Sequence, residues 1–538
     1  MKNSSSVLRG FLSQIGLLLL SSVVFSLSFP SFVSDRGFAV LSFISVIPVF
    51  IVVHRSSWKG IAFYGIFYGF VTYAIFNYWL STFHPLAIII VPIIYAVYFM
   101  ILFPFLKLAD KLFPRNGYLV QIFLWISYEY LRTKGFLGYP YGNIGYALSF
   151  WLPFIQSSSF LGSWGISFIV VFPSAFLGNA LKDGRQGFKD FVLEQKRAAA
   201  VYGVLFVVNF VYGALVMQDY SGYPQWKVAL IQHNADTWKG GIRTYERNFG
   251  ILKRLSLEAV KENPDIVIWS ETSFVPGVDW HSRYRTDKER YALVKELKDF
   301  LATQKIPYVI GNDDGQIKDP ALPPVLADGT YNRKDYNATF LYENGELKQT
   351  YRKIQLVPFT ENFPYKKQFP KFYQLLVDHD YHFWEKGTEY TVFEADGVKF
   401  STPICYEDVF GYISRNFVKR GAQVIVNMTN DSWSGAVSAE MQHMQMAVFR
   451  AIENRRSVVR STNSGMTVTI DPDGRILKSI KPFTEGYLVG EIPVYDKEIT
   501  LYTRLGNWFA FLSLGLSVFF LGLGIIRRIR EIIIDKRG

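Results

Sequence analysis

The segment VKFSTPICYED, residues 398–408, runs from an apolar strand into the start of a helix and contains the only cysteine of this 538-residue chain, Cys405. A single cysteine excludes a disulfide within the chain and a cysteine-rich metal site. A lone cysteine usually packs as a small buried hydrophobe. Where a strand meets a helix, however, its sulfur lies near a helix N-terminus, whose dipole favours the thiolate. The surrounding sequence therefore decides between packing and chemistry.

The sequence on both sides of Cys405 alternates between strand and helix patterns. Short apolar runs predict strands at WKVALIQ (226–232), DIVIWSE (265–271), IPYVIGN (306–312) and GAQVIVNMTN (421–430), and two more around a Pro-Asp-Gly turn within residues 457–480. Helical spacing is found in Thr244–Glu262, Lys288–Gln304 and Met441–Asn454. NATFLYENGEL, residues 337–347, predicts a hairpin with Asn344-Gly345 at its turn. Strands that alternate with helices indicate sheets covered by helices.

Outside residues 218–505, apolar runs dominate the chain. A membrane-spanning helix needs about 20 apolar residues. We expect eight spans: Phe11–Ser28, Phe38–Val53, Ile61–Leu80, Leu86–Phe105, Leu119–Leu131, Trp151–Leu177, Ala199–Met217 and Trp508–Ile526. The first is expected to be a retained helix rather than a signal peptide, because no small-residue cleavage site precedes Pro30.

Basic residues between these spans predict the topology. Clusters of Lys and Arg follow the second, fourth and sixth spans and lie at both ends of the chain, and such residues favour the cytoplasmic side. We therefore expect a seven-helix membrane domain at residues 1–217, an extracytoplasmic domain at 218–505, and a last span with a basic cytoplasmic tail at 506–538. These clusters account for the net charge of +12, so no nucleic-acid partner is expected.

Two further segments contain charged residues that cysteine chemistry uses. Glu271 ends DIVIWSE, and YRKIQLVPFTE, residues 351–361, contains Lys353 and Glu361. Alone, a carboxylate after a strand is usually solvated or caps a helix, and a single Lys is usually a surface charge. Together with ICYED (404–408), NDSWSG (430–435) and NRRSVVRSTNSG (454–465), however, these segments resemble the nitrilase superfamily of carbon–nitrogen hydrolases. The resemblance implies an α-β-β-α sandwich with a Glu-Lys-Cys triad, and we expect neither a metal nor a cofactor.

The chemistry of these residue types fits an acyl-enzyme mechanism. We expect Cys405 to be the nucleophile, and Glu271 to take the thiol proton and later to remove one from the incoming nucleophile. The Lys353 ammonium, with the backbone N–H of Tyr406, stabilises the tetrahedral oxyanion. Glu361 pairs with Lys353 and keeps it charged and oriented.

Tethering to a membrane distinguishes this domain from soluble amidases and resembles the family of apolipoprotein N-acyltransferases. RTKGFLGYPYGNIGYAL (132–148) and FIQSSSFLGSWGISFIVV (154–171) are similar to segments of that family, although Leu137-Gly138 replaces its usual Pro-Trp. The resemblance makes Tyr406 and Glu407 supporting candidates, where otherwise they would simply begin a helix. It also makes Trp238 a candidate mobile aromatic near the cavity, with ordinary packing as the alternative.

This second resemblance implies a two-step reaction in the bacterial cytoplasmic (inner) membrane. Cys405 takes an acyl chain from the sn-1 ester of a phospholipid, typically phosphatidylethanolamine, as a thioester. The α-amino group of a diacylglyceryl-cysteine at the N-terminus of an apolipoprotein then accepts the chain. Two alternatives stay open: a membrane-tethered amidase or nitrilase, and a catalytically silent scaffold for a partner transferase. Acyl-chain preference and client lipoproteins also stay open.

Overall fold

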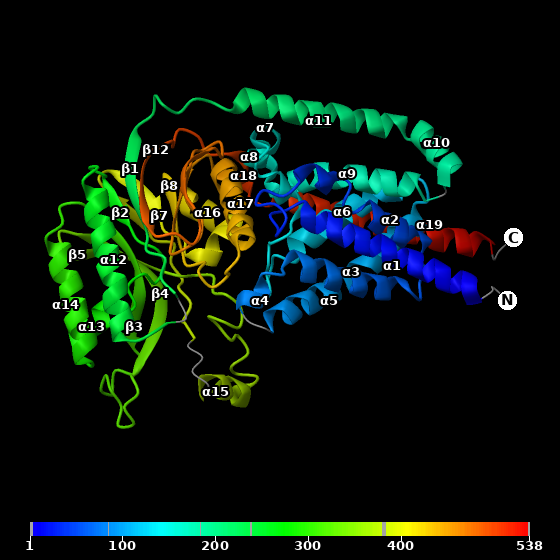
Figure 1. The fold of residues 1–538 in the computed structure, drawn as a ribbon. Coiled ribbons are helices and arrows are strands. Elements are labelled where there is room, and N and C mark those ends of the chain that lie inside the picture. Colours follow the sequence, from blue (N-terminus) through cyan, green and yellow to red (C-terminus); the bar gives the residue numbers. More distant parts are fainter. Residues whose placement is uncertain (1–3, 84–85, 183, 237–238, 379–382, 536–538) are drawn as a thin grey trace. The chain divides into compact units, whose positions relative to one another are not determined.

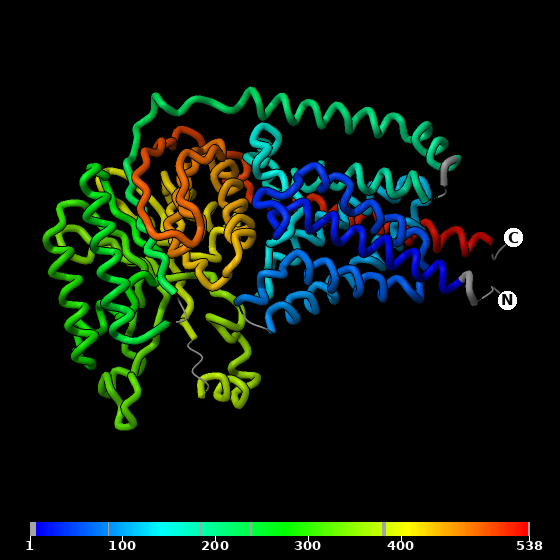
Figure 2. The backbone as a smooth tube through the Cα atoms, viewed as in Figure 1, coloured from blue at the N-terminus to red at the C-terminus, as the bar shows by residue number. Residues whose placement is uncertain are grey.

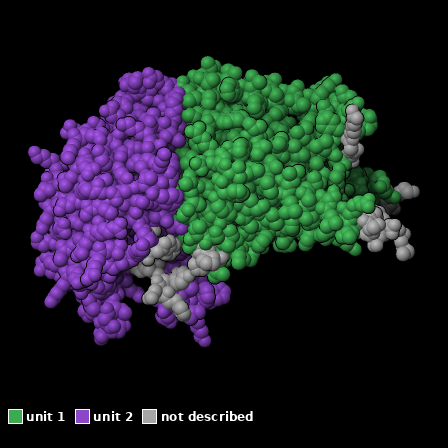
Figure 3. All heavy atoms as spheres, in the orientation of Figure 1, with its two compact units in different colours: residues 1–217, 434–449, 505–538 green, residues 218–433, 450–504 purple. Residues whose placement is uncertain are grey.

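A computed structural model describes residues 4–83, 86–182, 184–236, 239–378 and 383–535. The chain divides into two compact units (Figure 3). Unit 1 comprises Met1–Met217, Ser434–Phe449 and Leu505–Gly538, and unit 2 comprises Gln218–Trp433 and Arg450–Arg504. Unit 1 therefore includes one segment that lies between two parts of unit 2 in the sequence.

Unit 1 is helical (Figures 1 and 2). Its main helices are α1 (Ser4–Leu27), α2 (Ile47–Arg55), α3 (Ile61–Phe76), α4 (Leu80–Phe83), α5 (Ala87–Leu112), α6 (Gly117–Leu131), α9 (Ser163–Ala180), α10 (Gly184–Glu194), α11 (Lys196–Val216) and α19 (Trp508–Asp535). Within the described residues, five stretches are long and apolar enough to cross a membrane: Val7–Leu27, Ala87–Leu112, Ser163–Ala180, Lys196–Val216 and Trp508–Asp535. These coincide with the first, fourth, sixth, seventh and eighth predicted spans, while α2, α3 and α6 are shorter.

Several predicted spans have wrong boundaries, and the third ends at Phe76 rather than at Leu80. The sixth does not begin at Trp151, because α7 (Leu152–Ile155) and α8 (Ser158–Leu161) precede α9 as separate turns. Gly162, at a φ of 67°, ends α8 in the left-handed region, where an α-helix cannot continue. The second is divided into a 3-10 helix, Ala39–Phe43, and the nine-residue α2.

Unit 2 contains two six-stranded sheets, in the orders β12-β1-β2-β3-β4-β5 and β11-β10-β9-β8-β7-β6. The strands are β1 (Gln225–Gln232), β2 (Ile266–Ile268), β3 (Tyr308–Ile317), β4 (Arg333–Glu343), β5 (Glu346–Arg352), β6 (Val392–Ala395), β7 (Val398–Ser401), β8 (Val424–Thr429), β9 (Ser457–Thr462), β10 (Thr467–Ile470), β11 (Ile476–Ile480) and β12 (Gly486–Pro493). Parallel pairing joins β1 to β2, β2 to β3, β7 to β8 and β8 to β9. The other pairs are antiparallel.

The two sheets pack face to face with helices outside them (Figure 1). The rings of Trp226 on β1 and Phe400 on β7 lie 5.2 Å apart, and the hydroxyls of Thr339 and Thr402 are 2.7 Å apart. On the first sheet, α12 (Ile242–Val260) and α14 (Lys288–Ala302) bury an apolar core against the strands. On the second, α16 (Gly411–Lys419) buries Ile413 and Phe417. The predicted α-β-β-α sandwich is confirmed.

Most predicted elements of unit 2 are present. The hairpin turns at Asn344 and Gly345, with φ values of 51° and 78°, as a type I′ turn requires. The predicted helices correspond to α12 and α14 and, mostly within unit 1, to α17 (Val437–Asn454). The sequence patterns missed α13 (Val278–Tyr284), α15 (Pro370–Asp378), α18 (Leu501–Leu505), β6 and β12, and they predicted two strands within residues 457–480 where the structure has three, β9, β10 and β11. Of these, β12 pairs with β1 along its whole length and forms the edge of the first sheet.

The predicted strand DIVIWSE is too long, because β2 ends at Ile268. Beyond it the chain crosses the middle of β3 so closely that a Cβ on Gly311 would lie 2.4 Å from the carbonyl oxygen of Ser270. Thr272 then takes a φ of 43°. Glu271 therefore lies in a bend rather than in a strand.

The predicted helix start at Cys405 is instead a five-residue 3-10 helix, η3 (Cys405–Val409), and the α-helix α16 begins only at Gly411. Cys405 itself has a φ of 50°, in the left-handed region that a non-glycine residue rarely adopts. A helix this short has little dipole, so the thiolate must be stabilised mainly by other groups.

Candidate functional site

Three of the sequence-predicted residues meet in one buried cluster within unit 2. The Lys353 ammonium, just after β5, lies 3.1 Å from Oε1 of Glu271 and 2.8 Å from Oε1 of Glu361. Lys353 is 1% exposed and Glu271 6% exposed, so water screens this interaction little. Two carboxylates against one ammonium leave the ionised cluster with a net negative charge, which favours taking up a proton.

Asn337 on β4 completes the cluster, and sequence reasoning missed it. Its side-chain Nδ2 donates to Oε1 of Glu271 over 2.7 Å and to Oε1 of Glu361 over 3.2 Å. The same two oxygens thus receive hydrogen bonds from both Asn337 and Lys353. The backbone N–H of Lys353 also donates to the Asn337 carbonyl over 2.8 Å, which fixes the two residues together. Only pairing of β4 with β5 brings Asn337 here, so no local signal marks it.

Backbone groups hold the remaining carboxylate oxygens. The N–H of Asn430, in the loop after β8, donates to Oε2 of Glu271 over 2.9 Å. The N–H of Val357 donates to Oε2 of Glu361 over 2.7 Å. Both carboxylates are therefore oriented from two sides, as a general base and its partner need to be.

Cys405 lies at the turn between β7 and η3, and its side chain is 8% exposed. Asn427 on β8 donates its side-chain N–H to the carbonyl oxygen of Cys405 over 3.1 Å and to that of Pro403 over 3.2 Å. These bonds hold the backbone in its left-handed conformation. Such strain persists only where the surroundings enforce it, and it occurs often at functional sites.

Charges and burial shift the pKa values of all three groups. Burial raises the pKa of the Cys405 thiol well above its usual value and the nearby Glu271 adds to this rise, while Lys353 opposes it. Burial also raises the pKa of Glu271, again against Lys353. For Lys353, burial lowers the pKa, but Glu271 and Glu361 outweigh burial and hold it well above its ordinary range. The site thus combines a permanent cation, a carboxylate with raised basicity and a thiol that needs a base.

Glu407 is fully buried and connects the Lys353 segment to the Cys405 turn. Its carboxylate accepts N–H groups from Ile354, Gln355 and Ile404 at 2.6, 2.9 and 2.7 Å. The hydroxyl of Tyr351 also lies 2.8 Å from both of its oxygens. Burial raises the pKa of Glu407 to about 7, against the lowering effect of these backbone donors. Glu407 is therefore a structural link rather than a solvated residue at a helix start.

Tyr406 and Trp238 are the remaining residues that the sequence predicted for the site. Tyr406 is buried, and its ring packs edge-on against Phe410 at 5.1 Å. Trp238 lies outside the described residues, so its predicted role as a mobile aromatic stays a prediction.

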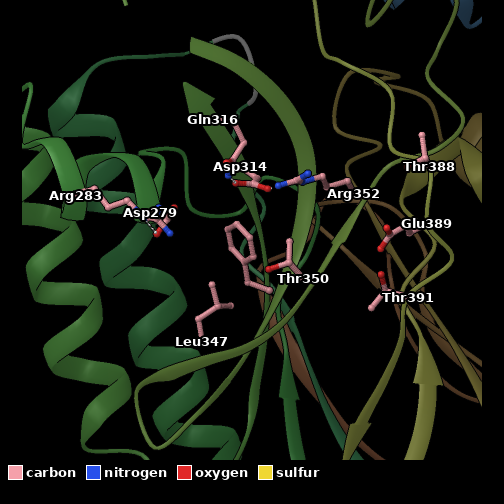
Figure 4. Close-up of a pocket in the computed structure, with 11 residues that line it drawn as sticks. Asp279, Arg283, Asp314, Gln316, Leu347, Thr350, Arg352, Thr388, Glu389 and Thr391 are labelled. Atoms are coloured by element: carbon pink, nitrogen blue, oxygen red, sulfur yellow. Dashed lines mark hydrogen bonds and ion pairs between the residues drawn. The ribbon is translucent and has the colours of Figure 1, made fainter. Parts of the chain in front are cut away.

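A separate polar cavity of about 360 Å³ lies among β3, β4, β5, α13 and residues 388–391 (Figure 4). Figure 4 shows Asp314 and Arg352 pointing toward each other, at 2.5 Å, and Asp279 pairs with Arg283 at 2.9 Å. The lining of this cavity includes Arg352, at the end of β5, but not Lys353, Glu271 or Glu361. The cavity is therefore distinct from the cluster around Lys353.

Comparison with known proteins gives matches over nearly the whole chain. Residues 227–497 match the carbon-nitrogen hydrolase family, and residues 21–176 match the apolipoprotein N-acyltransferase N-terminal domain. Apolipoprotein N-acyltransferase 1 of Treponema denticola is 41% identical over 509 residues, which cover 92% of this chain and 93% of that protein. Apolipoprotein N-acyltransferase 1 of Treponema pallidum is 40% identical over 542 residues, covering 96% and 97%. Apolipoprotein N-acyltransferase of Geobacter metallireducens is 30% identical over 511 residues, covering 92% of each chain.

Proposed function

This chain belongs to the apolipoprotein N-acyltransferase family, and on that premise we propose that Cys405 carries a fatty acyl group from a membrane phospholipid to the N-terminal amine of apolipoproteins. The family performs the last step of lipoprotein maturation and combines a carbon–nitrogen hydrolase domain with apolar helices. The roles of the site residues, the phospholipid donor and the membrane topology are all parts of this proposal.

In the first step, Cys405 attacks the sn-1 ester carbonyl of a phospholipid of the phosphatidylethanolamine type. Glu271 takes the thiol proton as the sulfur–carbon bond forms. The Lys353 ammonium stabilises the negative charge on the former carbonyl oxygen. When the carbon–oxygen bond breaks, Glu271 returns the proton to the leaving alkoxide. The products are a Cys405 thioester and a lysophospholipid.

In the second step, the α-amino group of a diacylglyceryl-cysteine attacks the thioester. Such an amine has a pKa of about 7.7–8.0, so part of it is already neutral near pH 7. Glu271 removes a proton from the attacking nitrogen as the carbon–nitrogen bond forms. The carbon–sulfur bond breaks, the sulfur takes back the proton from Glu271, and the amide leaves. This is ping-pong chemistry through one nucleophile.

The observation that carries this proposal is the buried contact of Lys353 with both Glu271 and Glu361, whose charges act on the only thiol of the chain, Cys405. The raised pKa of Glu271 suits a base that must exchange protons near neutral pH. Asn337 and Asn430 hold that carboxylate in place.

The basic clusters of the sequence support the topology of the proposal. Residues 1–217 and 506–538 form the membrane part, and residues 218–505 lie on the extracytoplasmic side of the bacterial inner membrane. Both substrates are then lipids of the leaflet that this domain faces.

A reconstituted assay tests the proposal against its alternatives. The purified protein in vesicles of phosphatidylethanolamine is given a synthetic diacylglyceryl-cysteine peptide, and peptide masses are measured. We expect each peptide to gain one acyl group as an amide, with Cys405→Ala inactive. Release of free fatty acid without peptide acylation would instead indicate a hydrolase, and no acylation of protein or peptide would indicate a scaffold.

A further inference from the structure

A buried triad of charges lies behind the nucleophile in unit 2. The guanidinium of Arg460 on β9 contacts Oδ2 of Asp408 through Nη1, and its Nη2 lies 3.2 Å from Oδ2 of Asp431. All three side chains are buried. Removal of one member of such a group leaves an uncompensated charge in a medium of low dielectric constant. The planar fork of arginine can contact two carboxylates at once, which a lysine ammonium cannot do with the same geometry.

The two carboxylates belong to the two loops that carry the proposed chemistry. Asp408 lies in η3, three residues after Cys405. Asp431 directly follows Asn430, whose N–H donates to Oε2 of Glu271. Arg460 therefore joins the turn of the nucleophile to the loop that orients the base.

The neighbouring strands β8 and β9 support the same arrangement. Arg460 is paired in register with Asn427 of the neighbouring strand β8, and Asn427 donates to the carbonyl oxygen of Cys405. Thr429, at the end of β8, donates its hydroxyl to Oδ1 of Asp431 over 3.3 Å. The nucleophile turn and the Asn430–Asp431 loop are thus fixed to the same pair of central strands.

We propose that Arg460 is a positioning residue that joins the Cys405 turn to the Asn430–Asp431 loop, and that Asp431 sets part of the negative charge which the Cys405 thiolate faces. Neither residue touches the substrate. The inference rests on the proposed role of Cys405 as nucleophile. In this arrangement Asp431 helps to keep the resting thiol protonated until Glu271 takes the proton.

The charges that face Cys405 define the expected sign. Glu271, Asp431 and Glu361 disfavour the thiolate, and Lys353 favours it. Asp431→Asn removes one negative charge but keeps the shape of the side chain. The thiolate should then form at lower pH than in the parent protein.

Alkylation of Cys405 measures this directly, because the chain contains no other thiol. The full-length protein in detergent is treated with iodoacetamide from pH 6 to 10, and the rate is followed by intact mass. We expect Asp431→Asn to be alkylated several-fold faster than the parent protein at each pH of this range, because the pKa of the thiol lies high and a larger fraction of it is ionised in the variant. This assay needs no acyl transfer, so its outcome is independent of whether Cys405 acts as the nucleophile, which Cys405→Ala tests separately.

A second buried ion pair provides a matched control. Asp473 is fully buried, pairs with Arg455 and lies 3.2 Å from Nη1 of Arg475. Asp473→Asn should lower thermal stability as Asp431→Asn does, but it should leave the alkylation profile of Cys405 unchanged. A profile for Asp431→Asn that coincides with those of the parent and Asp473→Asn would overturn the proposal.

Arg460→Lys tests the joining role and also serves if Asp431→Asn does not fold. The charge is kept, but a single ammonium cannot contact both carboxylates in the same way. We expect acyl loading of Cys405 from phospholipid to slow by about tenfold to a hundredfold, as for a small misplacement of reacting groups. Loading at the parent rate in Arg460→Lys would show that the two loops need no such link.

Discussion

Replacement of Lys353 by Met tests the electrostatic core of the site. Lys353 is buried and contacts Glu271 and Glu361 at 3.1 and 2.8 Å, so methionine fills much of its volume but removes the only cation of the cluster. Loss of one donor to a developing oxyanion costs a factor of about 10²–10³ in rate, or about 2.7–4 kcal/mol. We expect at least this loss in the rate of acyl loading from phospholipid.

The same replacement should also change the pH dependence of loading. Lys353 opposes the rise in the pKa of Glu271 that burial causes, so its removal raises that pKa further. More of Glu271 is then protonated at a given pH and cannot take the thiol proton. The deficit of Lys353→Met should therefore be larger at pH 6 than at pH 8, and the rising limb of the rate should move to higher pH.

The assay is single-turnover loading of the purified protein from phosphatidylethanolamine vesicles, followed by intact mass. Arg352→Met is a matched control, because Arg352 is the adjacent residue and contacts Asp314 in the separate cavity. We expect the control to load at nearly the parent rate. Lys353→Arg should remain impaired, because a planar guanidinium does not fit the place of a compact ammonium. Loading of Lys353→Met within a fewfold of the parent rate would refute the assigned role.

Three further predictions concern the partners of the cluster and the topology. Glu361→Gln removes a negative charge that raises the pKa of Glu271, so the rising limb of the loading rate should move to lower pH. An unchanged pH dependence would show that Glu361 does not affect the pKa of Glu271. Glu407→Gln places an amide N–H₂ against backbone donors of Ile354, Gln355 and Ile404, and should lower the free energy of unfolding by about 2–4 kcal/mol in chemical denaturation; an unchanged midpoint would mean that this link is not needed. A reporter fused after Gln225 should read as extracytoplasmic, and a cytoplasmic signal would disprove the topology.

The site was predictable where its residues lie in distinctive local patterns. Glu271 ends an apolar run, Cys405 lies where another apolar run meets an expected helix start, and Lys353 lies within YRKIQLVPFTE; their order in the chain fits a known superfamily. The residues that link them were not predictable. Asn337 reaches Glu271 only because β4 and β5 pair, and Arg460 reaches Asp408 across 52 positions of sequence. Such contacts depend on register between distant strands, which local patterns do not contain.

The errors in local structure have physical causes as well. The strand at DIVIWSE ended early because a neighbouring backbone crosses at Gly311, a contact outside the segment. The α-helix expected at Cys405 was a short 3-10 helix, because Glu407 turns back and accepts the N–H of Ile404. In the membrane part, Gly162 divided an apolar run whose composition alone suggests one long helix. In each case the segment was apolar as predicted, but its helix or strand began or ended at a different residue.

The account depends most directly on formation of an acyl-enzyme at Cys405. The protein is incubated with phosphatidylethanolamine alone, its intact mass is measured, and a sample is then treated with neutral hydroxylamine. We predict a mass increase of one fatty-acyl group that hydroxylamine removes, no increase in Cys405→Ala, and none in Glu271→Gln, because the same carboxylate accepts the thiol proton. An acyl adduct that resists hydroxylamine, or one that still forms in Cys405→Ala, would contradict the account.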